Sequence, residues 1–140
     1  MEEALLTFIG SQEKSKQQDL LSLHELMRSI LPSGKLWLED GKNEEGKVVT
    51  NPTIGYGQQT MLLAKGKSRE MFQIGISGTS TGISIYLIGI RDKVDLAKQF
   101  GSKLGKAKVT GYCIKFKQLS DVNLAVLEEV IRLGIERTNP

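Results

Sequence analysis

The residues of this chain best suited to chemistry are lysines spaced by glycines. Lys103, Lys106 and Lys108 alternate with Gly101 and Gly105. Because glycine leaves the backbone uncovered, main-chain amides and ammonium groups could together approach an anion closely. The spacing is not that of a Walker loop, which needs a Lys-Ser/Thr pair. The segment predicts a site for a small anionic or phosphate-bearing ligand, with turn geometry as the alternative explanation of the glycines.

A glycine-aromatic-glycine turn and a single tryptophan are the next candidates for that site. Gly55, Tyr56 and Gly57 form a turn whose aromatic ring would have little steric cover. Trp37 lies in a short apolar stretch upstream. We expect Trp37 and Tyr56 to converge with the lysines on one concavity if the anion hypothesis holds.

The remaining reactive side chains do not form a catalytic or metal-binding constellation. His24, the only histidine, lies beside an apolar helical stripe and is predicted to be structural or at the surface. Cys113 is predicted to be a buried inert thiol, although Lys115 and Lys117 alternate onto its side and leave a lowered pKa open. One cysteine and one histidine cannot complete a tetrahedral zinc site. We predict no catalytic residue, metal or cofactor, and the sequence favours a non-enzymatic protein without deciding the question.

Length and composition predict one domain spanning residues 1–140. The chain is 39% hydrophobic and 25% charged, which is ordinary for a globular protein. A single cysteine and an acidic start without a signal-like pattern predict a cytoplasmic location. The longest near-apolar stretch, residues 83–90, is too short to cross a bilayer, so no membrane partner is expected.

Charge is distributed unevenly along the chain. Residues 91–117 hold eight basic and two acidic residues, a local net charge of +6 against +3 for the whole chain. A solvated face is the usual meaning of such a run. Weak nucleic-acid binding through this segment is a less favoured alternative. Carboxylates near the start of the chain leave a frataxin-like iron chaperone as another alternative, with few ligands to support it.

Hydrophobic periodicity predicts an α+β fold. We expect helices at residues 2–9, 11–31, 92–100 and 120–138, with Ser11 and Ser120 capping the two long ones. We expect strands at residues 35–39, 59–65, 70–77, 83–90 and 110–117. The polar insertion at residues 38–51 is expected to fold back through residues 47–50 as a hairpin. Short turns favour a mostly antiparallel sheet, with the N- and C-terminal helices packed on one face.

Three local sequence patterns carry finer expectations. Phe72, Ile74 and Ile76 should share one face of a half-buried strand. Residues 83–90 are apolar on both sides, which predicts a central strand. Leu119 and Leu124 should form a hydrophobic staple at the start of the last helix, with Leu124 in its core stripe. An open sheet with free edges also makes a homodimer a candidate assembly.

The later half of the chain resembles the YdhG-like family of small bacterial domains. The resemblance is carried by GYG at residues 55–57, ISIYLIGI at 83–90, KLGKAK at 103–108 and CIKFKQLSDVNLAVLEEVI at 113–131. The insertion at residues 38–51 has no counterpart in that pattern. The resemblance implies an α+β fold and, from one member group described as a frataxin-like iron chaperone, the iron alternative. The expected function is a binding protein for a small anionic ligand or a protein partner.

Overall fold

The computed structural model describes residues 1–90 and 95–138. Its main sheet has six strands in the order β1-β2-β5-β6-β8-β7, and every ladder is antiparallel. A separate two-stranded hairpin is formed by β3 and β4. The predicted α+β class and the antiparallel sheet are therefore confirmed.

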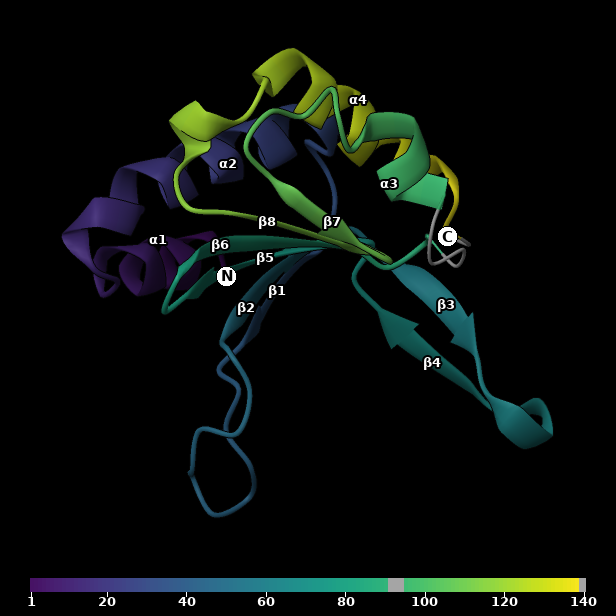
Figure 1. The fold of residues 1–140 in the computed structure, drawn as a ribbon. Coiled ribbons are helices and arrows are strands. Elements are labelled where there is room, and N and C mark those ends of the chain that lie inside the picture. Colours follow the sequence, from purple (N-terminus) through teal and green to yellow (C-terminus); the bar gives the residue numbers. More distant parts are fainter. Residues whose placement is uncertain (91–94, 139–140) are drawn as a thin grey trace.

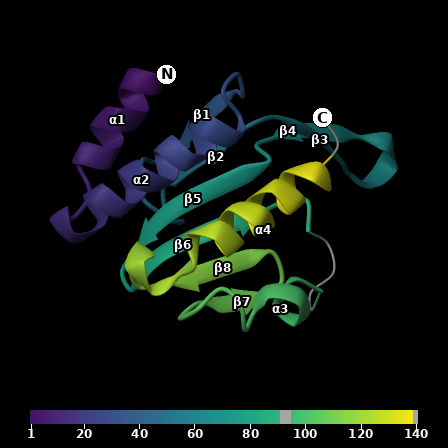
Figure 2. The same cartoon turned by 90° about the horizontal axis from the view of Figure 1, so that it is seen from above.

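The helices lie on one face of the sheet (Figures 1 and 2). They are α1 (Glu2–Gly10), α2 (Lys14–Ile30), α3 (Asp95–Phe100) and α4 (Leu124–Glu136). The strands are β1 (Leu36–Glu39), β2 (Thr53–Tyr56), β3 (Gln59–Leu62), β4 (Ser68–Met71), β5 (Ile74–Thr79), β6 (Gly82–Leu87), β7 (Lys108–Thr110) and β8 (Cys113–Phe116). Two 3-10 turns, Ala64–Gly66 and Leu119–Asp121, complete the described elements. We call the sheet face away from the helices the open face.

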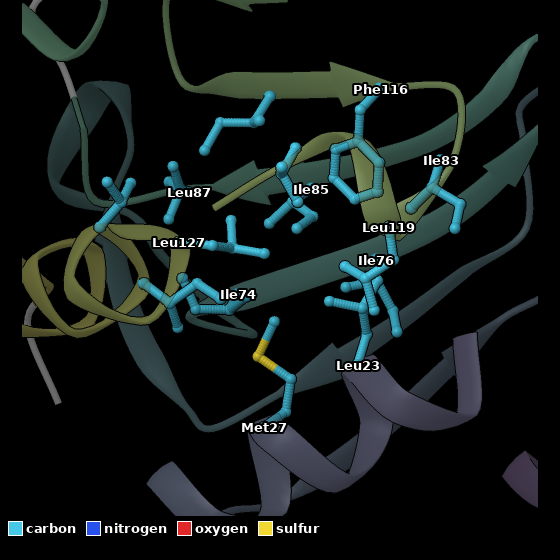
Figure 3. Packing of buried hydrophobic residues seen from close by; sticks show 14 of the residues in the cluster. Leu23, Met27, Ile74, Ile76, Ile83, Ile85, Leu87, Phe116, Leu119 and Leu127 are labelled. Atoms are coloured by element: carbon cyan, nitrogen blue, oxygen red, sulfur yellow. The ribbon is translucent and has the colours of Figure 1, made fainter. Parts of the chain in front are cut away.

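Strand alternation fills the space between sheet and helices with apolar side chains. Ile76 lies opposite Ile85, and Ile85 lies opposite Ile114, so one row of isoleucines crosses three strands. Leu23 and Met27 of α2 and Leu127 of α4 pack onto the sheet in the same cluster (Figure 3). These side chains are fully buried. Their burial is the main force that holds the two layers together.

Both predicted serine caps of the long helices are wrong. The α2 helix begins at Lys14, and the Ser11 hydroxyl instead donates to Phe8 O at the end of α1. The α4 helix is capped by Asn123, whose Oδ1 accepts from the amides of Ala125 and Val126. Ser120 lies in the preceding 3-10 turn.

The start of α4 also differs from the predicted staple. The chain reaches α4 through the 3-10 turn and an extended Val122. Leu124 is consequently 52% exposed rather than part of the core.

Two of the predicted strands are each interrupted by a turn in the structure. Residues 70–77 are split between β4 and β5, so Phe72 does not share a face with Ile74 and Ile76. Residues 110–117 are split between β7 and β8 by a turn that contains Gly111. Glycine at a φ of 58° makes this turn possible.

The insertion pairs differently from the expectation. The strand that returns alongside β1 is β2, in register from Leu36 opposite Tyr56 to Glu39 opposite Thr53. Residues 47–50 fold back on residues 41–43 rather than on β1, through an isolated bridge between Lys42 and Val48 and through backbone hydrogen bonds to Gly41 and Asn43. The insertion instead extends away from the sheet on its open side (Figure 1).

Candidate functional site

The open face of the sheet carries the polar side chains of the inner strands. Ser84 and Tyr86 of β6 alternate with Ile83 and Ile85, which face the helices. The prediction that this strand is apolar on both sides is therefore wrong. Its inner position, between β5 and β8, agrees with the expectation of a central strand.

The ladder registers place two rows of side chains across the open face. One row runs from Tyr86 to Cys113 and on to Thr110. The parallel row runs from Ser84 to Lys115 and on to Lys108. Since successive residues on one face are about 7 Å apart along a strand, a hydroxyl- and thiol-bearing row lies beside a row ending in two lysines.

A pocket of about 400 Å³ lies over these rows. Its lining comes from β5, β6, the β7–β8 hairpin and the base of the insertion. It consists of Asn51, Thr79, Thr81, Ser84, Tyr86, Thr110, Tyr112, Cys113 and Lys115. Each of these side chains carries a group that can donate a hydrogen bond. Lys115 is the one ionised residue among these lining residues, and no carboxylate is among them.

The two lysines of the second row face each other across β7 and β8. Lys108 and Lys115 are direct cross-strand partners, and both are exposed. Among residues 1–90 and 95–138, neither lysine forms an ion pair. Like charges directly opposite each other destabilise a sheet. In the absence of an anion, the repulsion between Lys108 and Lys115 therefore destabilises this edge of the sheet.

Cys113 lies at the floor of the pocket, where it is only 8% exposed. Burial raises the pKa of its thiol, and the nearby Lys115 ammonium and a hydrogen bond with Ser84 oppose that shift without cancelling it. The prediction of a buried thiol is confirmed, and the lowered pKa that the lysine spacing had left open does not occur. A protonated thiol at neutral pH is a weak nucleophile.

The two aromatic candidates from the sequence lie on opposite faces of the sheet. Tyr56 is 1% exposed and points toward the helices, where its hydroxyl is 2.7 Å from His24 Nδ1. Trp37 lies on the open side, where its indole donates to Gly57 O at 2.7 Å. Alternation along β2 separates the two rings, because the residue across from Trp37 is Gly55.

Gly55 is covered by Phe72 on the open face. A Cβ at Gly55 would lie 2.5 Å from Phe72 Cγ, and one at Gly75 would lie 2.6 Å from Phe72 Cε1. Trp37 meets the same ring edge-on, with the ring centroids 6.4 Å apart. The glycine-aromatic-glycine motif therefore makes room for an aromatic cover and exposes no ring of its own. Gly57, at a φ of 80°, makes the turn that follows.

The predicted lysines are also separated. Lys103 and Lys106 lie in the connection from α3 to β7, where the Lys106 amide donates to Asp121 O at 2.9 Å. Only Lys108 reaches the open face, and it lies on β7, at the sheet edge opposite Trp37 on β1. Trp37, Tyr56, Lys106 and Lys108 thus do not converge on one concavity. Arg91 and Lys93 of the predicted basic segment lie outside the described residues.

His24 is buried within a hydrogen-bonded chain that links two helices to the sheet. Its Nε2 is 2.8 Å from Glu2 Oε1 on α1, and its Nδ1 bonds Tyr56 on β2. Burial and the nearby Glu2 carboxylate raise the pKa of Tyr56, while Arg28 opposes the shift. Because Tyr56 is buried, these hydrogen bonds hold α1 and α2 against β2 and offer no surface for a substrate.

Sequence reasoning missed most of the pocket. The signal was present in the alternation of Ser84 and Tyr86 with isoleucines, and of Cys113 and Lys115 with Ile114. Asn51 and Thr81 carried no such signal, because their place in the pocket depends on how distant segments meet.

Metal and membrane features were searched over residues 1–90 and 95–138. Within these ranges, no three His, Cys, Asp or Glu side chains are grouped so that they could hold a metal ion. None of the described helices has the length and apolar character needed to cross a membrane. The iron-chaperone and nucleic-acid alternatives stay predictions.

Compared with known proteins, the chain matches no family model, and no curated protein or solved structure is significantly similar to it. The resemblance of its later half to the YdhG-like family therefore stays a prediction.

Proposed function

We propose that this protein is a non-enzymatic binding protein for a small anionic ligand, held in the open-face pocket beside Lys115. The observation that supports this most directly is the cross-strand pair of Lys108 and Lys115, which has no ion-pair partner among the described residues. An anion between the two ammonium groups would turn a repulsive pair into an attractive triad. The same proposal includes a cytosolic location for the protein, as expected from its single cysteine.

The rest of the lining suits an anion that carries a polar or ring-shaped body. Ser84 and Cys113 supply donors on the pocket floor, and Thr110 adds a hydroxyl beside them. Tyr86 and Tyr112 form an aromatic wall, with their ring centroids 6.4 Å apart. Because no carboxylate lines the pocket in the described chain, nothing there repels a phosphate or carboxylate group.

The direct test is titration of the wild-type protein and of Lys115→Met with inorganic phosphate and with phenyl phosphate. We expect Lys115→Met to weaken binding at least about tenfold, since a charge-assisted hydrogen bond contributes about 1.5–3 kcal/mol. The matched control is Lys106→Met, which removes the same charge from a lysine outside the pocket and should bind like the wild type. Equal affinity of the wild type and Lys115→Met would refute the proposal.

Two further readouts separate binding from general charge effects. Without ligand, Lys115→Met should be slightly more stable than the wild type, because it relieves the repulsion of Lys108. Phosphate should slow alkylation of Cys113 in the wild type, since a bound anion cancels the Lys115 field that lowers the thiol pKa. In Lys115→Met, phosphate should leave the alkylation rate unchanged.

A further inference from the structure

Two arms project from the main sheet on its open side. We define the insertion arm as residues 38–51, which starts with the last two residues of β1 and leads toward β2, and the hairpin arm as residues 59–71, which contains β3 and β4. Because one arm precedes β2 and the other follows it, they leave the sheet at opposite ends of that strand. Figure 1 shows both arms extending away from the helices.

Each arm exposes a pair of large apolar side chains. Val48 and Val49 of the insertion arm are 57% and 59% exposed, and Leu62 and Leu63 of the hairpin arm are 77% and 47% exposed. The hairpin arm pairs only with itself in the described part of the chain. An isolated two-stranded hairpin is marginally stable in water, so a cover would stabilise the hairpin arm. A cover over the insertion arm would remove its exposed valines from water.

The arms carry opposite charge. The insertion arm has four acidic residues and two lysines, a net charge of −2, whereas the hairpin arm has three basic residues and one glutamate, a net charge of +2. All of these side chains are exposed. None of them forms an ion pair with another described residue.

We propose that a second copy of this chain covers the arms, with the two open faces toward each other. A two-fold axis perpendicular to the line joining the arms places each insertion arm against the partner's hairpin arm, twice per dimer. The alternative two-fold, along that line, would place like-charged arms together. Opposite charges thus select one orientation, and the exposed valines and leucines supply buried apolar area.

The test reverses the charge of each arm separately. Variant A carries Glu44→Lys and Glu45→Lys in the insertion arm, and variant B carries Lys67→Glu and Arg69→Glu in the hairpin arm. Each variant alone should self-associate more than about tenfold more weakly than the wild type, because both contacts of its homodimer become repulsive. Mixed in equal amounts, A and B should form a heterodimer, since one contact is restored with reversed signs and the other is native.

Sedimentation velocity of the full chains distinguishes the outcomes. The wild type is expected at twice its 15.5 kDa mass at low salt, with dissociation promoted by added salt. The control with Lys103→Glu and Lys106→Glu makes the same charge change as variant B, but off the arms, and should remain dimeric. A monomeric wild type at low salt, or A and B that fail to associate although circular dichroism shows both folded, would overturn the proposal. Phosphate binding by a monomer would leave the proposed function intact while refuting the dimer.

Discussion

At the scale of single residues, burial decides what each polar group can do. The sequence suggested an uncovered ring for Tyr56 and a buried thiol for Cys113, yet both side chains are almost fully buried and carry raised pKa values. Lys115, which looks like one more surface lysine, lies opposite Lys108 at a pocket. The burial of each side chain and the residues next to it, and not its residue type, determine which of these side chains is available to a ligand.

The buried hydrogen bond between Tyr56 and His24 gives a prediction at this scale. Replacing Tyr56 by Phe keeps the ring and leaves His24 Nδ1 without its 2.7 Å partner. We expect a loss of about 1–2 kcal/mol in the free energy of unfolding, because a buried polar group loses its hydrogen bond. Urea denaturation measures it. Tyr112→Phe, at a 48% exposed tyrosine, should change the value by less than about 0.5 kcal/mol, and an equal loss in both variants would contradict this account.

At the scale of elements, the close approach of the Phe72 ring explains Gly55 and Gly75 better than turn geometry does. Gly55 and Gly75 face each other on β2 and β5, and Phe72 lies over both of them. The aromatic cover could not sit there if either residue carried a Cβ. This is a packing requirement between strands, and it accounts for two glycines inside strands that would otherwise weaken the sheet.

Gly55→Ala tests the packing beneath Phe72. The new methyl would lie 2.5 Å from Phe72 Cγ, so we expect a loss of about 1–3 kcal/mol in the free energy of unfolding from overpacking. Thermal or urea unfolding measures it. Gly10→Ala is the control and should be neutral or slightly stabilising, because outside its chain neighbours and the nearby backbone of its own helix no atom lies within 4 Å of the added carbon. In a Phe72→Leu background, Gly55→Ala should cost less, and an unchanged cost would show that the ring is not the cause.

At the scale of the whole molecule, contacts between distant segments assemble the fold. The Asp95 carboxylate at the start of α3 accepts from Arg137 Nη1 at 2.7 Å, just beyond the end of α4. The hydrogen bond from Arg137 is the main cause that lowers the pKa of Asp95, with Gln99 contributing next. The pair joins segments 42 positions apart in the chain.

This ion pair gives a pH-dependent prediction. Because the folded-state pKa of Asp95 is lowered, its contribution to stability is fully present above the unfolded-state pKa, about 3.9, and is lost as pH falls through the folded-state value. Asp95→Asn should therefore lower stability near neutral pH and make the acid-induced loss smaller. Unfolding curves between neutral and acidic pH measure it. Glu44→Gln, at an exposed insertion residue, should leave the pH dependence as in the wild type; a matching change there would refute the assignment to Asp95.

The sequence by itself determined the class of fold, the one-face placement of the long helices and the antiparallel strands, because periodicity and short turns act locally. It also indicated that Cys113 is buried in a strand. Only the tertiary structure decided which strands pair, that Tyr56 and Trp37 lie on opposite faces, and that Lys115 rather than Lys103 or Lys106 lies at a pocket. The physical reason is that a one-residue step along a strand reverses the face of a side chain. Which faces then meet depends on contacts between residues far apart in the chain.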